Sequence, residues 1–215
     1  MIKAVLVYVA FLDVSNALSA APSVSAVKTR RGLLDNLVGG GGKVAAAVGV
    51  LKVAADLESR KAGHEAVLSK ITADLRAQIA GDATVGAARI ESRIKTPASA
   101  AKKLIRNHLS GVDALNDVAA VRVVLADARG APDAERDIAR CYRVLANLEA
   151  AGRTDVAGVK HYVRFPKPNG YQSLHATCTP RDADLPRYEI QIRTARMHRV
   201  ATEGSARHDL YKARP

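Results

Sequence analysis

A short alternation near the end of the chain places the strongest constraint on its fold. In Glu189-Ile190-Gln191-Ile192-Arg193, polar and apolar residues strictly alternate. Successive side chains of a strand point to opposite faces, so this pattern predicts a strand with both isoleucines in the core. The other face of the same strand then carries an anion, an amide and a cation.

The surrounding sequence predicts the remaining elements of the fold. Apolar and β-branched runs predict strands at residues 118–125, 160–165, 173–179 and 187–193. Helix-forming composition predicts a long helix or a helix pair at 44–80, and further helices at 99–109, 133–150 and 194–211. From residue 118 onward the order is strand, helix, three strands and helix. This order predicts an α+β fold with a mixed or antiparallel sheet flanked by helices.

The 215 residues, 48% of them hydrophobic, suit one domain with an N-terminal appendage. Residues 1–20 combine Lys3, the apolar run 4–12 and a small-residue stretch, as a secretory signal peptide does, and import into an organelle is the alternative. The apolar run is too short for a permanent membrane span, which needs about 20 residues. Residues 21–43 read as a flexible linker ending in glycines, and residues 44–215 as the folded domain.

Charge and composition limit the class of partner. A formal net charge of +12 predicts an anionic partner such as a polyphosphate, a nucleic acid or an acidic membrane. With two Phe, six Tyr and no Trp, the chain is poorly supplied for stacking many bases, so a ligand that stacks once or twice fits better. Cys141 and Cys178 lack the number and spacing of a four-ligand zinc site, and we expect them in the core.

The segment from Phe165 to His175 predicts a rigid loop that holds a ligand. Proline presets φ and Asn-Gly tolerates positive φ, so the run Pro-Lys-Pro-Asn-Gly fixes a stiff turn. Lys167, Tyr171 and His175 are then presented from one loop.

Two carboxylates and three cations are the other candidates for chemistry. Asp117 and Glu189 stand at the heads of two apolar strands, and neighbouring strands would bring them together as ligands of Mg²⁺ carrying a nucleoside triphosphate. Arg93, Lys95 and Lys103 lie just before and within the helix at 99–109, where they suit phosphate. The alternatives are two surface acids at strand ends and a solvated basic face.

The order and spacing of these motifs resemble the RelA/SpoT alarmone synthetase family. The resemblance covers about residues 85–212 and rests on several separate motifs: Arg93-x-Lys95 with Ser99 and Lys103, Asp117 with Arg122, Pro-Lys-Pro-Asn-Gly-Tyr-Gln-Ser-Leu-His, Glu-Ile-Gln-Ile-Arg-Thr, and Ala-Thr-Glu-Gly with His208 and Tyr211-Lys212. Two departures are His161, where the family often has Asp, and the absence of a Trp in the last motif. The resemblance implies a nucleotidyltransferase-like fold in a small, synthesis-only form, and small forms often assemble as homo-oligomers.

The family resemblance also implies an activity, which is transfer of pyrophosphate from ATP to the 3′-hydroxyl of GDP or GTP with Mg²⁺. Arg93 and Arg122 would sandwich the adenine of ATP, and Lys95 and Lys103 would hold its phosphates. Asp117 and Glu189 would hold the metal, and Glu189 would also accept the proton of the attacking hydroxyl. The acceptor nucleotide would be bound by Lys167, Asn169, Tyr171, His175 and Gln191, and further candidates are Ser99, Arg193, His198 and Lys212.

Three other functions stay open at this point. Some relatives of this family attach pyrophosphate to the 3′ end of tRNA, and the net charge of +12 suits RNA. Others make adenosine alarmones, and Tyr171 would stack either purine. The third is an inactive, secreted module that binds nucleotide or RNA.

Overall fold

The computed structural model describes residues 41–128 and 133–204, with side chains from residue 49 onward. The predicted leader 1–20, most of the predicted linker 21–43, and Lys212 lie outside the described residues. The chain divides into two units. One comprises residues 1–57 and 96–109, and the other comprises residues 58–95 and 110–215.

A five-stranded mixed sheet forms the centre of the larger unit. Its order is β1-β2-β5-β4-β3, and its strands are β1 (Ala88–Ile94), β2 (Ala119–Leu125), β3 (Thr154–His161), β4 (Leu174–Pro180) and β5 (Tyr188–Thr194). Strands β2 and β5 are parallel, and the other neighbouring pairs are antiparallel. The predicted α+β fold with a mixed sheet is therefore confirmed.

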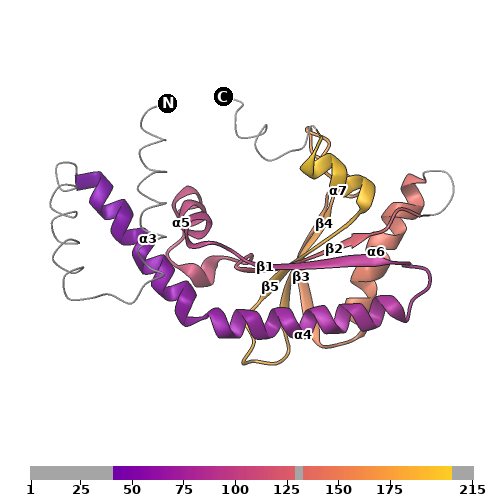
Figure 1. The fold of residues 1–215 in the computed structure, drawn as a ribbon, viewed down its shortest axis with the longest axis horizontal. Helices are drawn as coiled ribbons and strands as arrows, with labels where there is room; N and C mark the ends of the chain where they lie inside the picture. The colour runs from indigo at the N-terminus through magenta and orange to yellow at the C-terminus, as the bar shows by residue number, and fades with distance from the viewer. Residues whose placement is uncertain (1–40, 129–132, 205–215) are drawn as a thin grey trace. The chain divides into compact units, whose positions relative to one another are not determined.

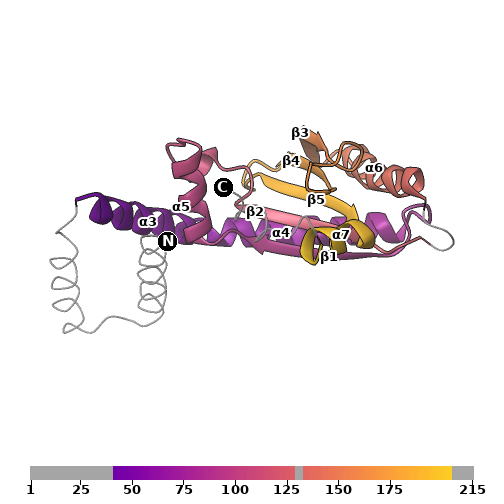
Figure 2. The same ribbon diagram turned by 90° about the horizontal axis from the view of Figure 1, so that it is seen from above.

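Two helices cover one face of the sheet. Helix α4 (Lys61–Ala80) packs on β1 and β2, α6 (Ala134–Ala150) packs on β5 and β3, and the two helices touch each other (Figures 1 and 2). The core between them buries alternate strand residues such as Val121, Ile190 and Ile192, each with 0% exposure. Asp133 begins α6 by accepting a hydrogen bond from the backbone N–H of Arg136. The opposite strand positions, including Glu189 and Gln191, lie on the face that these helices leave open.

The smaller unit includes helix α5 (Pro97–Arg106) and most of helix α3 (Gly41–Ser59). Thr96 begins α5 by accepting a hydrogen bond from the backbone N–H of Ser99, and Pro97 occupies the first turn, so the helix begins two residues before the predicted start at 99. The sequence predicted either one long helix or a helix pair at 44–80, and the structure shows the pair, α3 and α4. Helix α3 begins at Gly41, inside the segment expected as linker.

The structure corrects three predicted elements. Strand β1 was not among the predicted strands. Strand β3 ends at His161, and the predicted strand at 160–165 is wrong because the carbonyl of His161 accepts hydrogen bonds from Arg164 and Phe165 and closes a turn. Helix α7 spans Ala195–Thr202 and is followed by a turn, so the prediction of a helix from 194 to 211 is too long at residues 203–204.

Two further expectations concern the core and the membrane. Cys141 and Cys178 are both buried and free, which confirms them as core residues. Among residues 41–128 and 133–204, no helix combines the length and apolar character needed to cross a bilayer.

Candidate functional site

The open face of the sheet brings several predicted site residues onto adjacent strands. Glu189, Gln191 and Arg193 alternate along β5, as the sequence predicts. Register places Gln191 between Arg122 on β2 and His175 on β4. Glu189 lies opposite Ala120, three residues after Asp117. The parallel pairing of β2 with β5 therefore brings the two predicted carboxylates to the same end of the sheet.

Glu189 is the centre of a hydrogen-bonded cluster. Its Oε1 lies 2.7 Å from His175 Nδ1 and accepts a 3.2 Å hydrogen bond from Gln191 Nε2. His175 Nε2 in turn lies 2.9 Å from the Tyr171 hydroxyl. Burial acts to raise the pKa of Glu189, whereas the hydrogen bonds from His175 and Gln191 lower it, and the pKa lies below the usual value. Glu189 is therefore an anion held in a partly buried site.

Arg122 connects this cluster to the edge strand. Its Nε and Nη2 each donate a 3.3 Å hydrogen bond to Gln191 Oε1, and its Nη1 pairs with Glu91 Oε2 at 3.1 Å. Glu91 also pairs with Arg89 at 3.0 Å. Sequence reasoning missed Glu91. The sequence feature that could have identified Glu91 is the alternation Arg-Ile-Glu-Ser-Arg-Ile in β1, which places Glu91 on the same face as Arg93.

Asp117 and Glu189 form a carboxylate pair that fits a hard cation. Their side chains are 13% and 18% exposed, and the negative charge of Asp117 acts to raise the pKa of Glu189. Lys95 Nζ donates a 2.9 Å hydrogen bond to Asp117 Oδ2. The described residues contain no group of three or more His, Cys, Asp or Glu side chains arranged for a metal. Mg²⁺ commonly takes only one or two carboxylates and completes its shell with water and phosphate, so this pair suits it.

The predicted turn is present, and Tyr171 in it contacts His175. The backbone N–H of Gly170 donates to the carbonyl of Lys167 at 2.8 Å, and Gly170 has φ of 81°. Asn169 Oδ1 accepts from the backbone N–H of Tyr171. Lys167 Nζ lies 4.5 Å from the ring centre of Tyr162 and 5.2 Å from that of Tyr171. Tyr162 was not predicted, because its segment was assigned to a strand.

Arg193 is a buried cation beside the loop. It is 3% exposed, its guanidinium lies 5.9 Å from the ring centre of Tyr171, and its Nη2 lies 3.0 Å from His198 Nδ1 on α7. Burial and the neighbouring Arg122 lower the pKa of Arg193. The predicted residues Arg193 and His198 therefore belong to one cluster with Tyr171.

The remaining predicted residues are Arg93, Ser99, Lys103 and Lys212. Arg93 lies on β1 opposite Ala120 and is exposed. Ser99 and Lys103 lie on α5 in the smaller unit, where Ser99 participates in the cap of that helix. Lys212 lies outside the described residues.

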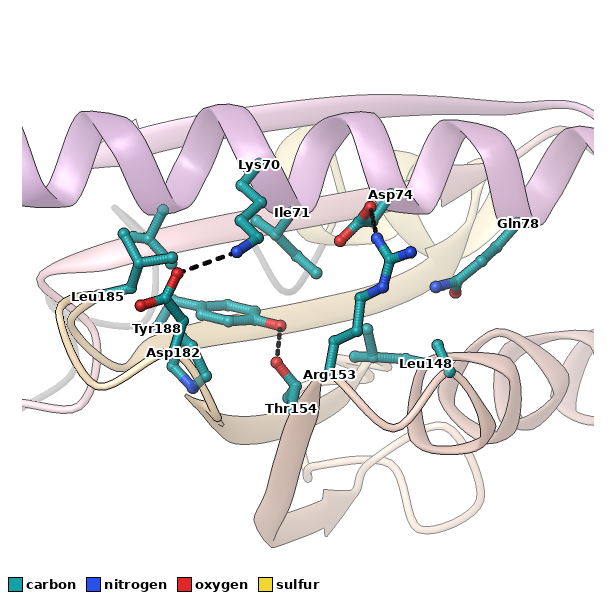
Figure 3. A pocket seen from close by; sticks show the side chains of 13 residues that line it. Lys70, Ile71, Asp74, Gln78, Leu148, Arg153, Thr154, Asp182, Leu185 and Tyr188 are labelled. Carbon is teal, nitrogen blue, oxygen red and sulfur yellow. Dashed lines mark hydrogen bonds and ion pairs between the residues drawn. The ribbon is translucent and has the colours of Figure 1, made fainter.

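A small pocket lies elsewhere, between α4, α6 and the core-facing side of the sheet (Figure 3). Its charged side chains pair with one another: Lys70 with Asp182 at 3.1 Å, and Arg153 with Asp74 at 2.7 Å. None of the predicted site residues lines it. Its charges are already neutralised within the protein, so it offers little to an anionic ligand.

Comparison with known proteins decides the family. The model of the region found in RelA/SpoT proteins matches residues 92–215, more than half of the chain. The chain belongs to the RelA/SpoT family. All the residues of the Glu189 cluster except Glu91 lie within the matched range.

Relatives and solved structures agree with this family. A chloroplastic GTP diphosphokinase of Oryza sativa subsp. japonica is 35% identical over 125 residues, which cover 57% of this chain but 21% of the relative. The RelA/SpoT-family chain thus spans about a fifth of that relative's length. The fold of this chain is similar to that of Bacillus subtilis small alarmone synthetase 2. The TM-score is 0.59, the identity is 24%, and the match covers 74% of this chain and 84% of that one. Small alarmone synthetase 1 of B. subtilis, bound to its product pppGpp, has TM-score 0.59, 20% identity, and coverage of 74% and 81%.

Proposed function

We propose that the chain transfers pyrophosphate from ATP to the 3′-hydroxyl of GDP or GTP, which releases AMP and gives a (p)ppGpp-type alarmone. The observation that carries this proposal is the Glu189 carboxylate, which is held beside Asp117 on one side and the Tyr171 loop on the other. The name of the rice relative, GTP diphosphokinase, and the product pppGpp in the Bacillus synthetase support the same reaction.

The donor nucleotide is assigned to the β1 and β2 side of the site. The family resemblance assigns Arg93 and Arg122 to the adenine of ATP and Lys95 and Lys103 to its phosphates, and Ser99 is a further candidate. Arg122 is available for a flat base because its planar guanidinium is 27% exposed and is held in place by Glu91. When ATP binds there, Arg122 either keeps its hydrogen bonds to Gln191 or exchanges them for contacts with the nucleotide.

The acceptor nucleotide is assigned to the loop. Tyr171 stacks on the guanine, and Lys167 and Asn169 contribute from the turn that presents it. Arg193 lies beside the ring of Tyr171, and His198 contacts Arg193; both are further candidates, as is Lys212.

Magnesium is the metal that we assign to Asp117 and Glu189. When bound, Mg²⁺ would neutralise charge on the ATP phosphates. The protein's own part is to place the two nucleotides in line and to accept a proton. Glu189 takes the proton of the 3′-hydroxyl, because its lowered pKa keeps it ionised at neutral pH.

The test is to incubate the full chain with Mg²⁺ and γ-labelled ATP and to offer GDP, GTP, AMP, ATP or deacylated tRNA as acceptor. We expect label on the guanine nucleotide together with equimolar AMP. Glu189→Gln should bind nucleotide within about threefold of the wild type and lose turnover by about 10²–10⁴-fold, the usual contribution of a general base. Equal activity of this variant and the wild type would refute the assignment of Glu189.

Transfer to tRNA is the second candidate, and the net charge of +12 favours it. Label on tRNA alone would make the chain an RNA-modifying enzyme. Label on AMP or ATP alone would indicate an adenosine alarmone, since Tyr171 stacks either purine. Nucleotide binding without transfer to any acceptor would indicate a binding module.

For location, we propose that residues 1–20 act as a targeting leader, with secretion as the first destination and organelle import as the second. The name of the rice relative, which is chloroplastic, supports the second. A fluorescent tag at the C-terminus decides between them. Fusion protein that stays only in the cytosol, at full length, would exclude both.

A further inference from the structure

The two carboxylate oxygens of Glu189 have different surroundings. Oε1 accepts from both His175 Nδ1, at 2.7 Å, and Gln191 Nε2, at 3.2 Å. Among residues 49–128 and 133–204, no group donates a hydrogen bond to Oε2. Two donors on a single oxygen fix the plane of the carboxylate and leave the second oxygen for a group from outside the protein.

Both donors are themselves held in place. A carboxylate only accepts hydrogen bonds, so Nδ1 of His175 must carry a proton, and in the neutral ring Nε2 then accepts from the Tyr171 hydroxyl at 2.9 Å. The ring of Tyr162 meets the His175 ring edge-on, with centroids 5.7 Å apart. Gln191 Oε1 accepts two bonds from Arg122, which orients its amide so that Nε2 faces Glu189.

These contacts leave little of either side chain for a nucleotide. Both ring nitrogens of His175 are engaged by the protein, and its side chain is 14% exposed. Gln191 is 8% exposed, and both ends of its amide are bonded. Direct contact with the acceptor nucleotide, the role implied by the family resemblance, would require these bonds to break.

We propose that His175 and Gln191 are positioning residues, which hold Glu189 with Oε2 toward the acceptor hydroxyl, and are not binding residues for the acceptor nucleotide. This inference rests on the proposed function. In the step concerned, the 3′-O–H bond breaks and its proton moves to Oε2 of Glu189. The 3′ oxygen forms a bond to the β-phosphorus of ATP. The bond between that phosphorus and the oxygen that bridges it to the α-phosphorus breaks, and its electron pair leaves with AMP.

The first test compares two substitutions at position 175. His175→Leu removes both hydrogen bonds, whereas His175→Asn retains an N–H donor near the place of Nδ1. Because misplacing a catalytic group by about 1 Å costs about 10²-fold, we expect His175→Leu to lower kcat about 100-fold. The KM and the Kd for GDP should both stay within about threefold. His175→Asn should regain at least about tenfold of the lost kcat.

Gln191→Met gives a second, independent variant, because methionine has a similar length and no donor. We expect it to lower kcat by about tenfold, the cost of about one hydrogen bond to a charged group, with Kd for GDP again little changed. Thr177→Val is the matched control: it lies on β4 directly opposite Glu189, and it should keep kcat within about twofold. Unfolding curves for each variant show that the comparison is between folded proteins.

A spectroscopic measurement tests the geometry without turnover. The ¹⁵N shifts of His175 in the ligand-free protein should show a proton on Nδ1 and none on Nε2, and Glu189→Gln should alter the Nδ1 signal more than the Nε2 signal. A proton on Nε2 alone would overturn the proposed hydrogen bond.

The kinetic outcomes separate this inference from the proposed function. A rise of tenfold or more in Kd for GDP in both His175 variants, with kcat unchanged, would make His175 a nucleotide-binding residue and overturn the inference alone. An unchanged kcat and Kd in His175→Leu would do the same. Wild-type protein that transfers label to no acceptor would overturn both. If the acceptor is tRNA or an adenine nucleotide, the same variants are compared with that acceptor.

Discussion

At the scale of single residues, Asp117 is the position at which the assigned metal can be tested apart from the base. Asp117→Asn keeps an oxygen that accepts from Lys95 Nζ but removes the negative charge of the proposed ligand. Loss of a metal-site interaction commonly costs 10–100-fold in affinity, so the Mg²⁺ concentration for half-maximal activity should rise by at least about tenfold. This is measured by Mg²⁺ titration after treatment with a chelator.

Asp113→Asn is the control for that substitution, because Asp113 is exposed and forms its ion pair with Arg60. It should leave the Mg²⁺ dependence unchanged. A Mg²⁺ requirement that is the same in Asp117→Asn and the wild type would show that Asp117 is not a metal ligand.

His64 gives a residue-scale prediction about stability. It is 5% exposed on α4, and neither ring nitrogen has a hydrogen-bond partner among the residues that the structure describes. Burial, assisted by Arg60, lowers the pKa of His64 from its ordinary value of 6.5. The unfolded chain therefore binds a proton below pH 6.5 that the folded chain excludes. The free energy of unfolding contributed by His64 is complete above that pH and falls as the pH decreases, by up to about 1.4 kcal/mol per pH unit.

Denaturant unfolding between pH 8 and pH 5 measures this effect. His64→Leu should flatten the decline relative to the wild type, whereas His108→Asn, at an exposed position with φ of 52° that asparagine tolerates, should not. Parallel declines in His64→Leu and the wild type would mean that other groups cause the pH dependence.

At the scale of elements, the loop from residue 166 to residue 173 is the proposed binding site of the acceptor. Gly170 has φ of 81°, a conformation that costs a residue with a Cβ roughly 1–2 kcal/mol. Gly170→Ala should therefore distort the turn between Lys167 and Tyr171 and raise the KM for the acceptor about tenfold. The KM for ATP should change less, because the donor residues lie on other elements.

Gly111→Ala is the matched control for this loop. Gly111 has φ of −170°, and a Cβ built there meets no atom within 4 Å. It should leave both KM values unchanged. Equal effects of the two substitutions, or an effect of Gly170→Ala on ATP alone, would contradict the placement of the acceptor at this loop.

The strands differ in how far their sequence determines them. In β5 the alternation of polar and apolar residues is strict, and Ile190 and Ile192 enter the core, so the pattern predicts the strand and places Glu189, Gln191 and Arg193 together on its other face. Strand β3 is an edge strand with a register shift between Ala157 and Lys160 and Gly158 at φ of 58°. Its bulge breaks the period of two on which sequence reading depends. The residues that follow, including buried Val163, were therefore predicted as a strand, although they form a turn.

At the scale of the whole molecule, the site depends on pairings between distant segments that local sequence does not encode. The convergence of Asp117 with Glu189 follows once β2 and β5 are parallel neighbours, and the sequence alone predicted only that neighbouring strands would bring them together. Which oxygen of Glu189 is engaged, and the roles of Glu91 and Tyr162, depend on side-chain geometry across three strands and a loop. Residue types and order were predictable, but hydrogen-bond partners were not.

The net charge of +12 belongs to the whole chain and gives the last prediction. Binding of RNA through its phosphates releases counterions, so a protein that makes several phosphate contacts loses affinity steeply with salt. We expect the affinity for a labelled RNA hairpin to fall at least about tenfold between 50 and 200 mM salt, measured by fluorescence anisotropy. The KM for GDP should rise much less, because GDP carries few charges and, in the proposed function, is also held by stacking on Tyr171. RNA affinity that persists at 200 mM salt would mean that the chain recognises RNA by more than charge, which would move the assignment from a nucleotide acceptor toward tRNA.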